Sequence, residues 1–159
     1  MNIFTESHQE LLKLLIKHQV NFLLIGGYAV IYYGYKRTTG DMDLWLEPSN
    51  ENKLKLIPVL EEFKFDKDGI KHISQLDFTK NLAFHFWEEP ERVDCLTRIS
   101  NVDFDDAFKQ KTIANIEGIS VPIIQYKHLI MSKMTTNRLK DKSDIEELQK
   151  IEEAKKNKK

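Results

Sequence analysis

The sequence predicts an α/β (α+β) domain in which helices flank a small mixed β-sheet. Segments whose apolar residues recur at helical spacing alternate with short apolar runs typical of buried strands. Residues 41–46 place two aspartates and a tryptophan on one face and three apolar side chains on the other, which is the alternation of a strand. The chain has 159 residues, of which 41% are hydrophobic, so it is long enough to bury one such core.

The first elements follow from capping and periodicity. A first helix is expected to begin at the capping box Ser7–Glu10 and to end near Gln19, because leucine and isoleucine follow the box at helical spacing. Residues 21–25 form a short apolar run typical of a buried strand, which two glycines end. A second helix is expected over residues 28–33, closed by Gly34.

The rest of the chain adds two hairpins and three longer helices. The expected order is a strand over 41–46, a helix from Ser49 to about Phe63 with a kink at Pro58, strands 82–87 and 92–97, a short helix near 105–109, strands 112–116 and 119–124, and helices over 125–134 and 140–155. We therefore expect a single domain over residues 1–155, followed by a disordered basic tail over residues 156–159.

Bulk properties limit the location and the partners of the protein. The formal net charge is −1, so no overall field draws the chain to nucleic acid or to a membrane. Cys95 is the only cysteine, which excludes an internal disulfide and favours a reducing cytosol. The N-terminus has no signal-peptide pattern, and the most apolar stretch, residues 22–35, is too short to span a membrane. A cytoplasmic protein without a membrane partner is expected.

Three aspartates are candidate metal ligands. Asp41 and Asp43 share one face of a strand, where their repulsion raises a pKa unless a cation lies between them. Mg²⁺ prefers such oxygen ligands together with substrate phosphates. Asp94 shares a face with Arg92 and Leu96 on a later strand, and it completes the cluster if the two strands are neighbours. The alternative is that the three aspartates are solvated surface carboxylates or caps.

A glycine pair precedes these aspartates. Gly26 and Gly27 follow a strand and open a helix, and without Cβ atoms their backbone N–H groups can approach an anion closely. The alternative is a tight turn that needs a positive φ. Together with the two aspartates on the next strand, the pair predicts a phosphate-binding turn beside a metal site.

These residues resemble the nucleotidyltransferase superfamily, whose fold is that of DNA polymerase β. Its signature pairs a glycine turn with an Asp–apolar–Asp motif, as in Gly26-Gly27 and in Asp41-Met42-Asp43-Leu44. Residues 37–43 and 119–148, including Lys133 and Arg138-x-x-Asp141, resemble in particular the abortive-infection nucleotidyltransferases, a group that includes toxins of toxin–antitoxin pairs. The lincosamide nucleotidyltransferases are more distant relatives of similar size.

The resemblance implies a metal-dependent transfer of a nucleoside monophosphate from an NTP to a hydroxyl of tRNA, a protein or a small molecule. Two Mg²⁺ ions are expected on Asp41, Asp43 and Asp94, with Asp94 helping to deprotonate the acceptor. The expected nucleotide-binding residues are Gly26, Gly27, Arg37, Thr39, Lys133 and Arg138.

Several of these roles have structural alternatives. Arg37 either steadies Asp41, contacts the triphosphate or is an ordinary surface arginine. Lys133 continues an apolar, inward-facing stripe, which favours a phosphate contact at a cleft. Arg138 either contacts substrate or pairs with Asp141, and Asp144 is expected only to decorate the first turn of its helix.

Two other functions stay open at this level. The chain could be a catalytically inactive module of the same fold that binds a nucleotide or a partner. It could also be a subunit that acts only with a partner chain, such as a cognate antitoxin. All three acidic positions are filled, which favours the enzyme.

Overall fold

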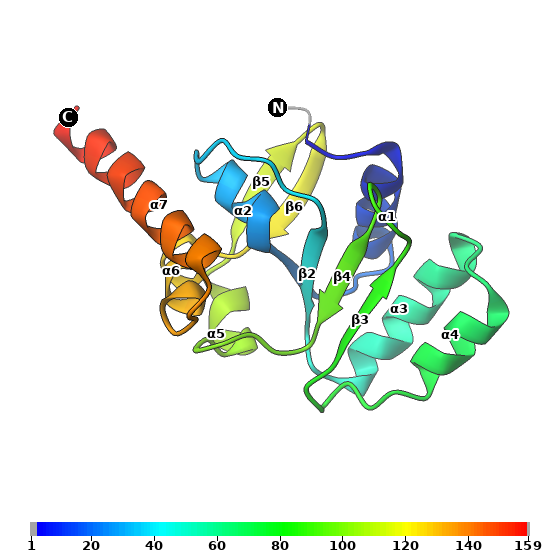
Figure 1. Cartoon of the computed structure of the whole chain (residues 1–159). Helices are drawn as coiled ribbons and strands as arrows, with labels where there is room; N and C mark the ends of the chain where they lie inside the picture. The colour runs from blue at the N-terminus through cyan, green and yellow to red at the C-terminus, as the bar shows by residue number, and fades with distance from the viewer. Residues whose placement is uncertain (1–2, 159) are drawn as a thin grey trace.

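The protein forms a six-stranded mixed sheet flanked by helices (Figure 1), as expected from the sequence. The structure is a computed structural model and describes residues 3–158. Its strands are β1 (Phe22–Ile25), β2 (Met42–Leu46), β3 (Ala83–Phe86), β4 (Val93–Leu96), β5 (Thr112–Ile116) and β6 (Ile119–Ile123). Its helices are α1 (Glu6–Lys17), α2 (Gly26–Tyr32), α3 (Asn50–Glu62), α4 (Lys67–Ser74), α5 (Phe104–Lys109), α6 (Tyr126–Met134) and α7 (Leu139–Asn157).

The strand order is β3-β4-β2-β1-β6-β5. Both hairpins expected from the sequence are present, as the antiparallel pairs β3–β4 and β5–β6. Between them, β1 and β2 pair antiparallel, β2 runs parallel to β4, and β1 runs parallel to β6. Because β2 and β4 are neighbours, residues far apart in the sequence meet on one face of the sheet.

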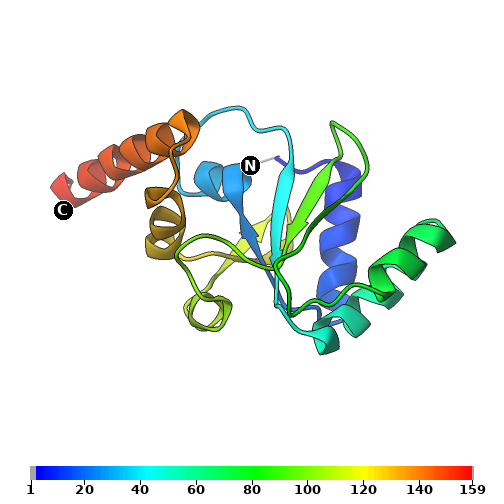
Figure 2. The ribbon, with the colours of Figure 1, turned by 60° about the horizontal axis from the view of Figure 1, so that its bottom comes forward.

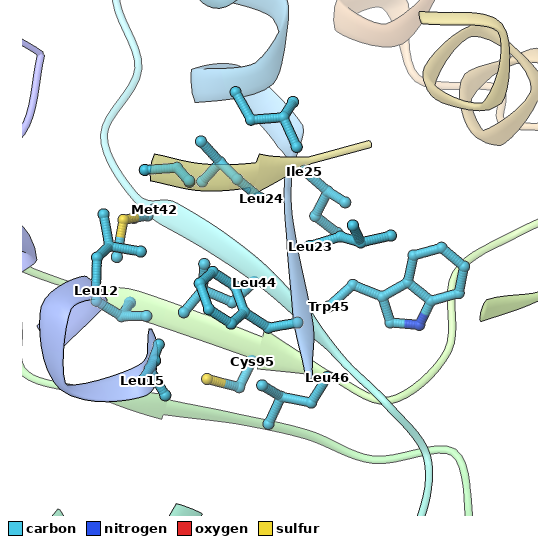
Figure 3. Packing of buried hydrophobic residues seen from close by; sticks show 14 of the residues in the cluster. Leu12, Leu15, Leu23, Leu24, Ile25, Met42, Leu44, Trp45, Leu46 and Cys95 are labelled. Carbon is cyan, nitrogen blue, oxygen red and sulfur yellow. The ribbon is translucent and has the colours of Figure 1, made fainter. Parts of the chain in front are cut away.

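The hydrophobic core lies on both faces of the central strands. Figure 3 shows Leu12 and Leu15 of α1 on the side to which Leu44 and Cys95 point, with Trp45 on the other side. Cys95 follows Asp94 on the strand, so it points to the opposite face and is buried in this core. The Trp45 indole donates a hydrogen bond to the carbonyl of Thr97 (3.2 Å) and meets the ring of Phe104 edge-on.

Helices at the two ends of the chain lie on different sides of the molecule. In Figures 1 and 2, α6 and α7 lie on one side, whereas α1, α3 and α4 lie on the other. The segment that joins α2 to β2 passes beside the start of α7 in Figure 2. No helix within residues 3–158 is both long and apolar enough to cross a bilayer.

The expected start of the first helix was wrong. The N-cap of α1 is Thr5, whose hydroxyl accepts a hydrogen bond from the backbone N–H of His8 (3.1 Å), so Ser7 lies inside the helix. Thr5 and Ser7 both carry a hydroxyl that can cap a helix. Thr5, whose backbone is extended, is the N-cap. The second helix also begins two residues earlier than expected, at Gly26, because the glycine turn itself forms its first turn.

Helix α4 was not expected, and α7 is longer than expected. Asp66 caps α4 through a hydrogen bond from Gly69 N–H (2.9 Å), but only Ile73 of this short helix is buried, so its periodicity is weak. Helix α7 continues through Asn157, so the assignment of residues 156 and 157 to a disordered tail was wrong. Lysines near a helix C-terminus favour this continuation. Lys159 lies outside the described residues.

Candidate active site

The three predicted acidic residues lie at the same end of two neighbouring strands. β2 and β4 run parallel in a register that sets Asp43 directly beside Asp94, and Asp41 immediately precedes β2. Residues paired in this way point to the same face of a sheet. All three aspartates line one cavity of about 410 Å³.

The predicted nucleotide-binding residues line the same cavity. They come from the glycine turn, the segment before β2, helix α6 and the start of α7: Gly26, Gly27, Arg37, Thr39, Lys133 and Arg138. Glu89, Lys140 and Asp141 also line it, although the sequence gave no reason to place Glu89 or Lys140 there. The cavity thus combines acidic residues from the sheet with basic residues from the surrounding segments.

The glycine turn approaches the acidic residues very closely. Gly26 has a positive φ of 68°, and a Cβ atom there would lie 2.1 Å from Oδ2 of Asp43. A Cβ atom on Gly27 would lie 2.3 Å from the hydroxyl oxygen of Thr39. A side chain at either position would have to displace Asp43 or Thr39, and the positive φ of Gly26 favours glycine, so the backbone of the turn lies next to the carboxylates.

Substitution of Gly26 tests this close approach. We expect Gly26→Ala to lower the free energy of unfolding by about 1–3 kcal/mol, from left-handed backbone strain and displacement of Asp43, and to abolish nucleotide binding. Gly118→Ala is the matched control, because Gly118 also has a positive φ of 83° but its Cβ would meet nothing within 4 Å. The control should lose only about 1 kcal/mol. Urea unfolding and nucleotide titration would show whether the two variants differ.

Repulsion and burial perturb two of the acidic residues. Burial, followed by the negative charges of Asp94 and Asp41, raises the pKa of Asp43 to about 6, against the opposing effect of Lys133. Burial and the charge of Asp94 also raise the pKa of Asp41. One oxygen of Asp41, Oδ1, is buried without a hydrogen-bond partner within residues 3–158. The negative charge of these carboxylates is therefore not fully compensated by neighbouring positive charge.

The raised pKa of Asp43 predicts a stability difference. In metal-free buffer, Asp43→Asn should raise the free energy of unfolding by about 1–3 kcal/mol at pH 7.5. The carboxyl pKa is higher in the folded than in the unfolded state, so ionisation destabilises the fold progressively from about pH 4 to about pH 6. The difference should therefore shrink through this range and disappear below about pH 3, where the carboxyl is protonated in both states. Equal urea midpoints for the two proteins at pH 7.5 would contradict the assigned shift.

Arg92 is a residue that sequence reasoning passed over. Its Nη2 lies 3.1 Å from Oδ1 of Asp94, and its Nε lies 3.7 Å from Oδ2 of Asp41. The sequence placed Arg92 on the same strand face as Asp94, and that spacing was the available signal for their contact. Within residues 3–158, the guanidinium of Arg92 is the cationic group that forms ion pairs with both of these carboxylates.

The carboxylates fit a hard divalent cation chemically, but their present conformations do not enclose one. Within residues 3–158, no three His, Cys, Asp or Glu side chains are arranged as a metal-binding group. Asp94 faces Arg92 instead. An unpartnered oxygen on Asp41 and the raised pKa of Asp43 nevertheless match a donor set that needs a cation.

A buried network of charges holds the basic side of the cavity. Arg37 contacts Asp144 through Nε (2.9 Å) and Nη2 (3.1 Å), and Lys133 contacts Asp141 (2.9 Å) and Asp144 (3.1 Å). Asp144 is only 1% exposed. The expectation that it merely decorates the first turn of its helix was therefore wrong. Arg37 is largely buried and is not an ordinary surface arginine.

Two further residues, Thr136 and Arg138, complete this side. Thr136 donates a hydrogen bond to Asp141 (2.7 Å) and so fixes its second oxygen. Hydrogen bonds and the charge of Lys133 lower the pKa of Asp141, although burial opposes them. Arg138 is mostly exposed and lies 4.0 Å from Asp141, so its guanidinium is available at the cavity.

A second cavity of about 400 Å³ continues the first. The two share Gly26, Lys133, Arg138 and Asp141. The second adds apolar walls from strand and helix residues that include Leu96 and Leu129. A polar, charged pocket thus opens into one with an apolar wall, which suits a ligand that has a phosphate part and a less polar part.

The fold is shared with solved structures, two of which are named as an adenylyltransferase and a nucleotidyltransferase. The chain is similar to the lincosamide antibiotic adenylyltransferase LnuA, solved with lincomycin bound, with a TM-score of 0.55 and 18% identity over 94% of this chain and 99% of that one. It is also similar to a proposed nucleotidyltransferase from Thermotoga maritima (TM-score 0.52, 12% identity, 94% and 87% covered). The antibiotic-resistance factor ANT(2'')-Ia gives a TM-score of 0.52 and 12% identity, with 96% and 90% covered. These likenesses show a shared fold.

Sequence comparison reaches further than the fold. No curated protein sequence matches the chain significantly. Residues 5–159 match the family described as "Nucleotidyl transferase of unknown function (DUF2204)". That match covers nearly the whole chain, and the protein therefore belongs to this family of nucleotidyl transferases.

Proposed function

We propose that the protein transfers a nucleoside monophosphate from an NTP to a hydroxyl acceptor in a reaction that depends on divalent metal. The observation that carries the proposal is the register that sets Asp43 beside Asp94, with the Gly26 turn in contact with Asp43. Basic residues face these carboxylates across one cavity. This is the arrangement that phosphoryl transfer needs, because it positions and neutralises phosphates.

Asp41, Asp43 and Asp94 would hold Mg²⁺, two ions in the proposed site. When bound, Mg²⁺ neutralises phosphate charge and lowers the pKa of a coordinated hydroxyl. The backbone of Gly26 and Gly27 would bind the terminal phosphates, and Asp94 would accept the proton of the attacking hydroxyl. A bond forms between the acceptor oxygen and the α-phosphorus, the bond from that phosphorus to the bridging oxygen breaks, and pyrophosphate leaves.

Residues on the other side of the cavity would orient the triphosphate. The buried carboxylates of Asp144 and Asp141 compensate the charges of Lys133 and Arg37 and hold both cationic groups in fixed positions at the cavity. Thr39 lies against the glycine turn, and the side chain of Arg138 is 72% exposed, so its guanidinium is accessible to a substrate. Fixed charge of this kind lowers the barrier without reorganisation during the reaction.

The acceptor class is proposed from resemblance alone. tRNA, a protein and a small molecule all carry suitable hydroxyls, and the resemblance to abortive-infection nucleotidyltransferases suggests a toxin with a cognate antitoxin. LnuA is a lincosamide antibiotic adenylyltransferase and ANT(2'')-Ia an antibiotic-resistance factor by name, which favours a small molecule among these candidates. Co-purification of the protein with the product of a neighbouring gene would test the antitoxin partner.

One observation favours a different function. Arg92 pairs with Asp94 and Asp41, the residues that would bind the metal. A chain in which this pairing is permanent would be a catalytically inactive module that binds a nucleotide or a partner. The two functions differ in whether binding of NTP depends on divalent metal.

The decisive experiment has an acceptor-independent part and an acceptor-dependent part. Calorimetric titration with each NTP, in Mg²⁺ and in EDTA, should show binding that requires the metal. Incubation with each labelled NTP and tRNA, total protein, aminoglycosides or lincosamides should then label one acceptor. Binding of NTP with equal affinity in EDTA, and no label in any acceptor, would support the inactive module instead.

A further inference from the structure

Arg92 has a fixed backbone and a movable side chain. Its carbonyl accepts a hydrogen bond from the backbone N–H of Met42 (3.1 Å), which ties it to the start of β2. Its side chain is 31% exposed, so the guanidinium has access to solvent. The residue can therefore exchange side-chain partners without disturbing the sheet.

The guanidinium engages oxygens that a cation would need. Arg92 Nε lies 3.3 Å from each oxygen of Asp94, and Nη2 lies 3.1 Å from Oδ1. The same Nε lies 3.7 Å from Oδ2 of Asp41, whose other oxygen has no partner. A planar guanidinium that bridges two carboxylates in this way neutralises charge that would otherwise be unpaired.

Deprotonation cannot free these oxygens. Hydrogen bonding to Asp94, together with the charges of Asp94, Asp41 and Glu88, raises the pKa of Arg92. The side chain keeps its charge at any physiological pH, so the oxygens become available only if the guanidinium moves. Glu88 also offers a nearby negative charge toward which it can turn.

We propose that Arg92 is a positioning residue that neutralises Asp41 and Asp94 in the metal-free protein and is displaced from them by the divalent cation. The inference rests on the proposed metal site. It also explains why three acidic residues at one end of the sheet are not arranged as a metal-binding group. Arg92 then sets the affinity for the cation, because the cation competes with an internal ion pair.

The test is a calorimetric titration of the nucleotide-free protein with Mn²⁺. Arg92→Ala should bind Mn²⁺ roughly three- to tenfold more tightly than the wild type, since a partly exposed ion pair no longer competes. The Mn²⁺ affinity of Arg92→Lys should lie between those of the wild type and Arg92→Ala, because lysine keeps the positive charge but not the forked donor geometry of the guanidinium. Arg98→Ala is the matched control, because it removes one positive charge just beyond β4, where Arg98 lines the second cavity, and no ion pair of Arg98 is seen within residues 3–158.

A spectroscopic measurement follows the guanidinium itself. The ¹⁵N signal of Arg92 Nε, assigned by its loss in Arg92→Lys, should show slow hydrogen exchange without metal and faster exchange in Mg²⁺. A purely structural role for Arg92 would leave this signal unchanged by Mg²⁺. The lysine variant also covers the case in which Arg92→Ala does not fold.

The outcomes separate this inference from the proposed function. If the wild type binds Mn²⁺ and Arg92→Ala binds it equally or more weakly, the role of Arg92 is overturned while the metal site stands. An equal gain in Mn²⁺ affinity in Arg92→Ala and Arg98→Ala indicates a general effect of net charge and also overturns the role of Arg92. If no protein of the series binds Mn²⁺, both the metal site and the role of Arg92 are overturned.

Discussion

The double variant Asp41→Ala/Asp43→Ala is expected to remain folded and to lose nucleotide transfer by at least about 10³-fold. Metal ions supply several kcal/mol of charge stabilisation in phosphoryl transfer, and each 1.36 kcal/mol is a factor of ten in rate. Folding should survive because the variant removes two like charges whose pKa values are already raised by burial and repulsion. Label incorporation, metal-dependent NTP binding and thermal unfolding measure the three consequences.

A matched control removes two acidic residues elsewhere. Asp68 and Asp105 are exposed residues in the first turns of α4 and α5, outside the cavity. The variant Asp68→Ala/Asp105→Ala carries the same change in net charge and should transfer label like the wild type. Retention of transfer by Asp41→Ala/Asp43→Ala would end the catalytic assignment of these carboxylates.

Asp144→Ala is expected to have the largest effect on stability, lowering the free energy of unfolding by about 3–5 kcal/mol. Asp144 is 1% exposed, and its loss leaves Arg37 without its bidentate partner in a buried position. Lys133 keeps Asp141 as a partner, so most of the lost stability should come from the unpaired charge of Arg37. Urea unfolding with an unchanged m-value would measure the loss.

Two comparison variants separate loss of the pair from loss of a side chain. Removal of both charges in Arg37→Met/Asp144→Leu should restore most of the stability, and a double-mutant cycle gives the coupling between the residues. Glu146→Ala, an exposed position on the same helix, should change stability by less than about 0.5 kcal/mol. A similar effect of Asp144→Ala and Glu146→Ala would show that the buried network is not a significant source of stability.

Much of the fold could be predicted because it is encoded over short distances. The strand over 112–116 has the predicted bounds, and both hairpins form where turn residues separate apolar runs. Helix α4 was not predicted, because a helix with one buried residue and a capping aspartate shows little hydrophobic periodicity in the sequence. The first cap was misplaced because Thr5 and Ser7 are locally equivalent, and only backbone geometry separates them.

The site was predictable to the extent that its residues share a strand or a turn. Alternation along β2 places Asp41 and Asp43 on one face in any fold that contains the strand. The prediction for Asp94 required that its strand lie beside β2. The observed parallel pairing of β2 with β4 fulfils this condition. The resemblance to nucleotidyltransferases supplied the same association, and the family match agrees with the resemblance itself.

The sequence by itself determined the glycine turn, the candidate acidic residues and the elements other than α4, because periodicity and backbone restrictions act within a few residues. Only the tertiary structure decided which charges compensate one another. Asp144 neutralises Arg37 across 107 positions of the chain, and Arg92 turns to Asp94 and Asp41. Such pairs form because burial makes an uncompensated charge unfavourable, and the partner within reach depends on how the helices pack against the sheet.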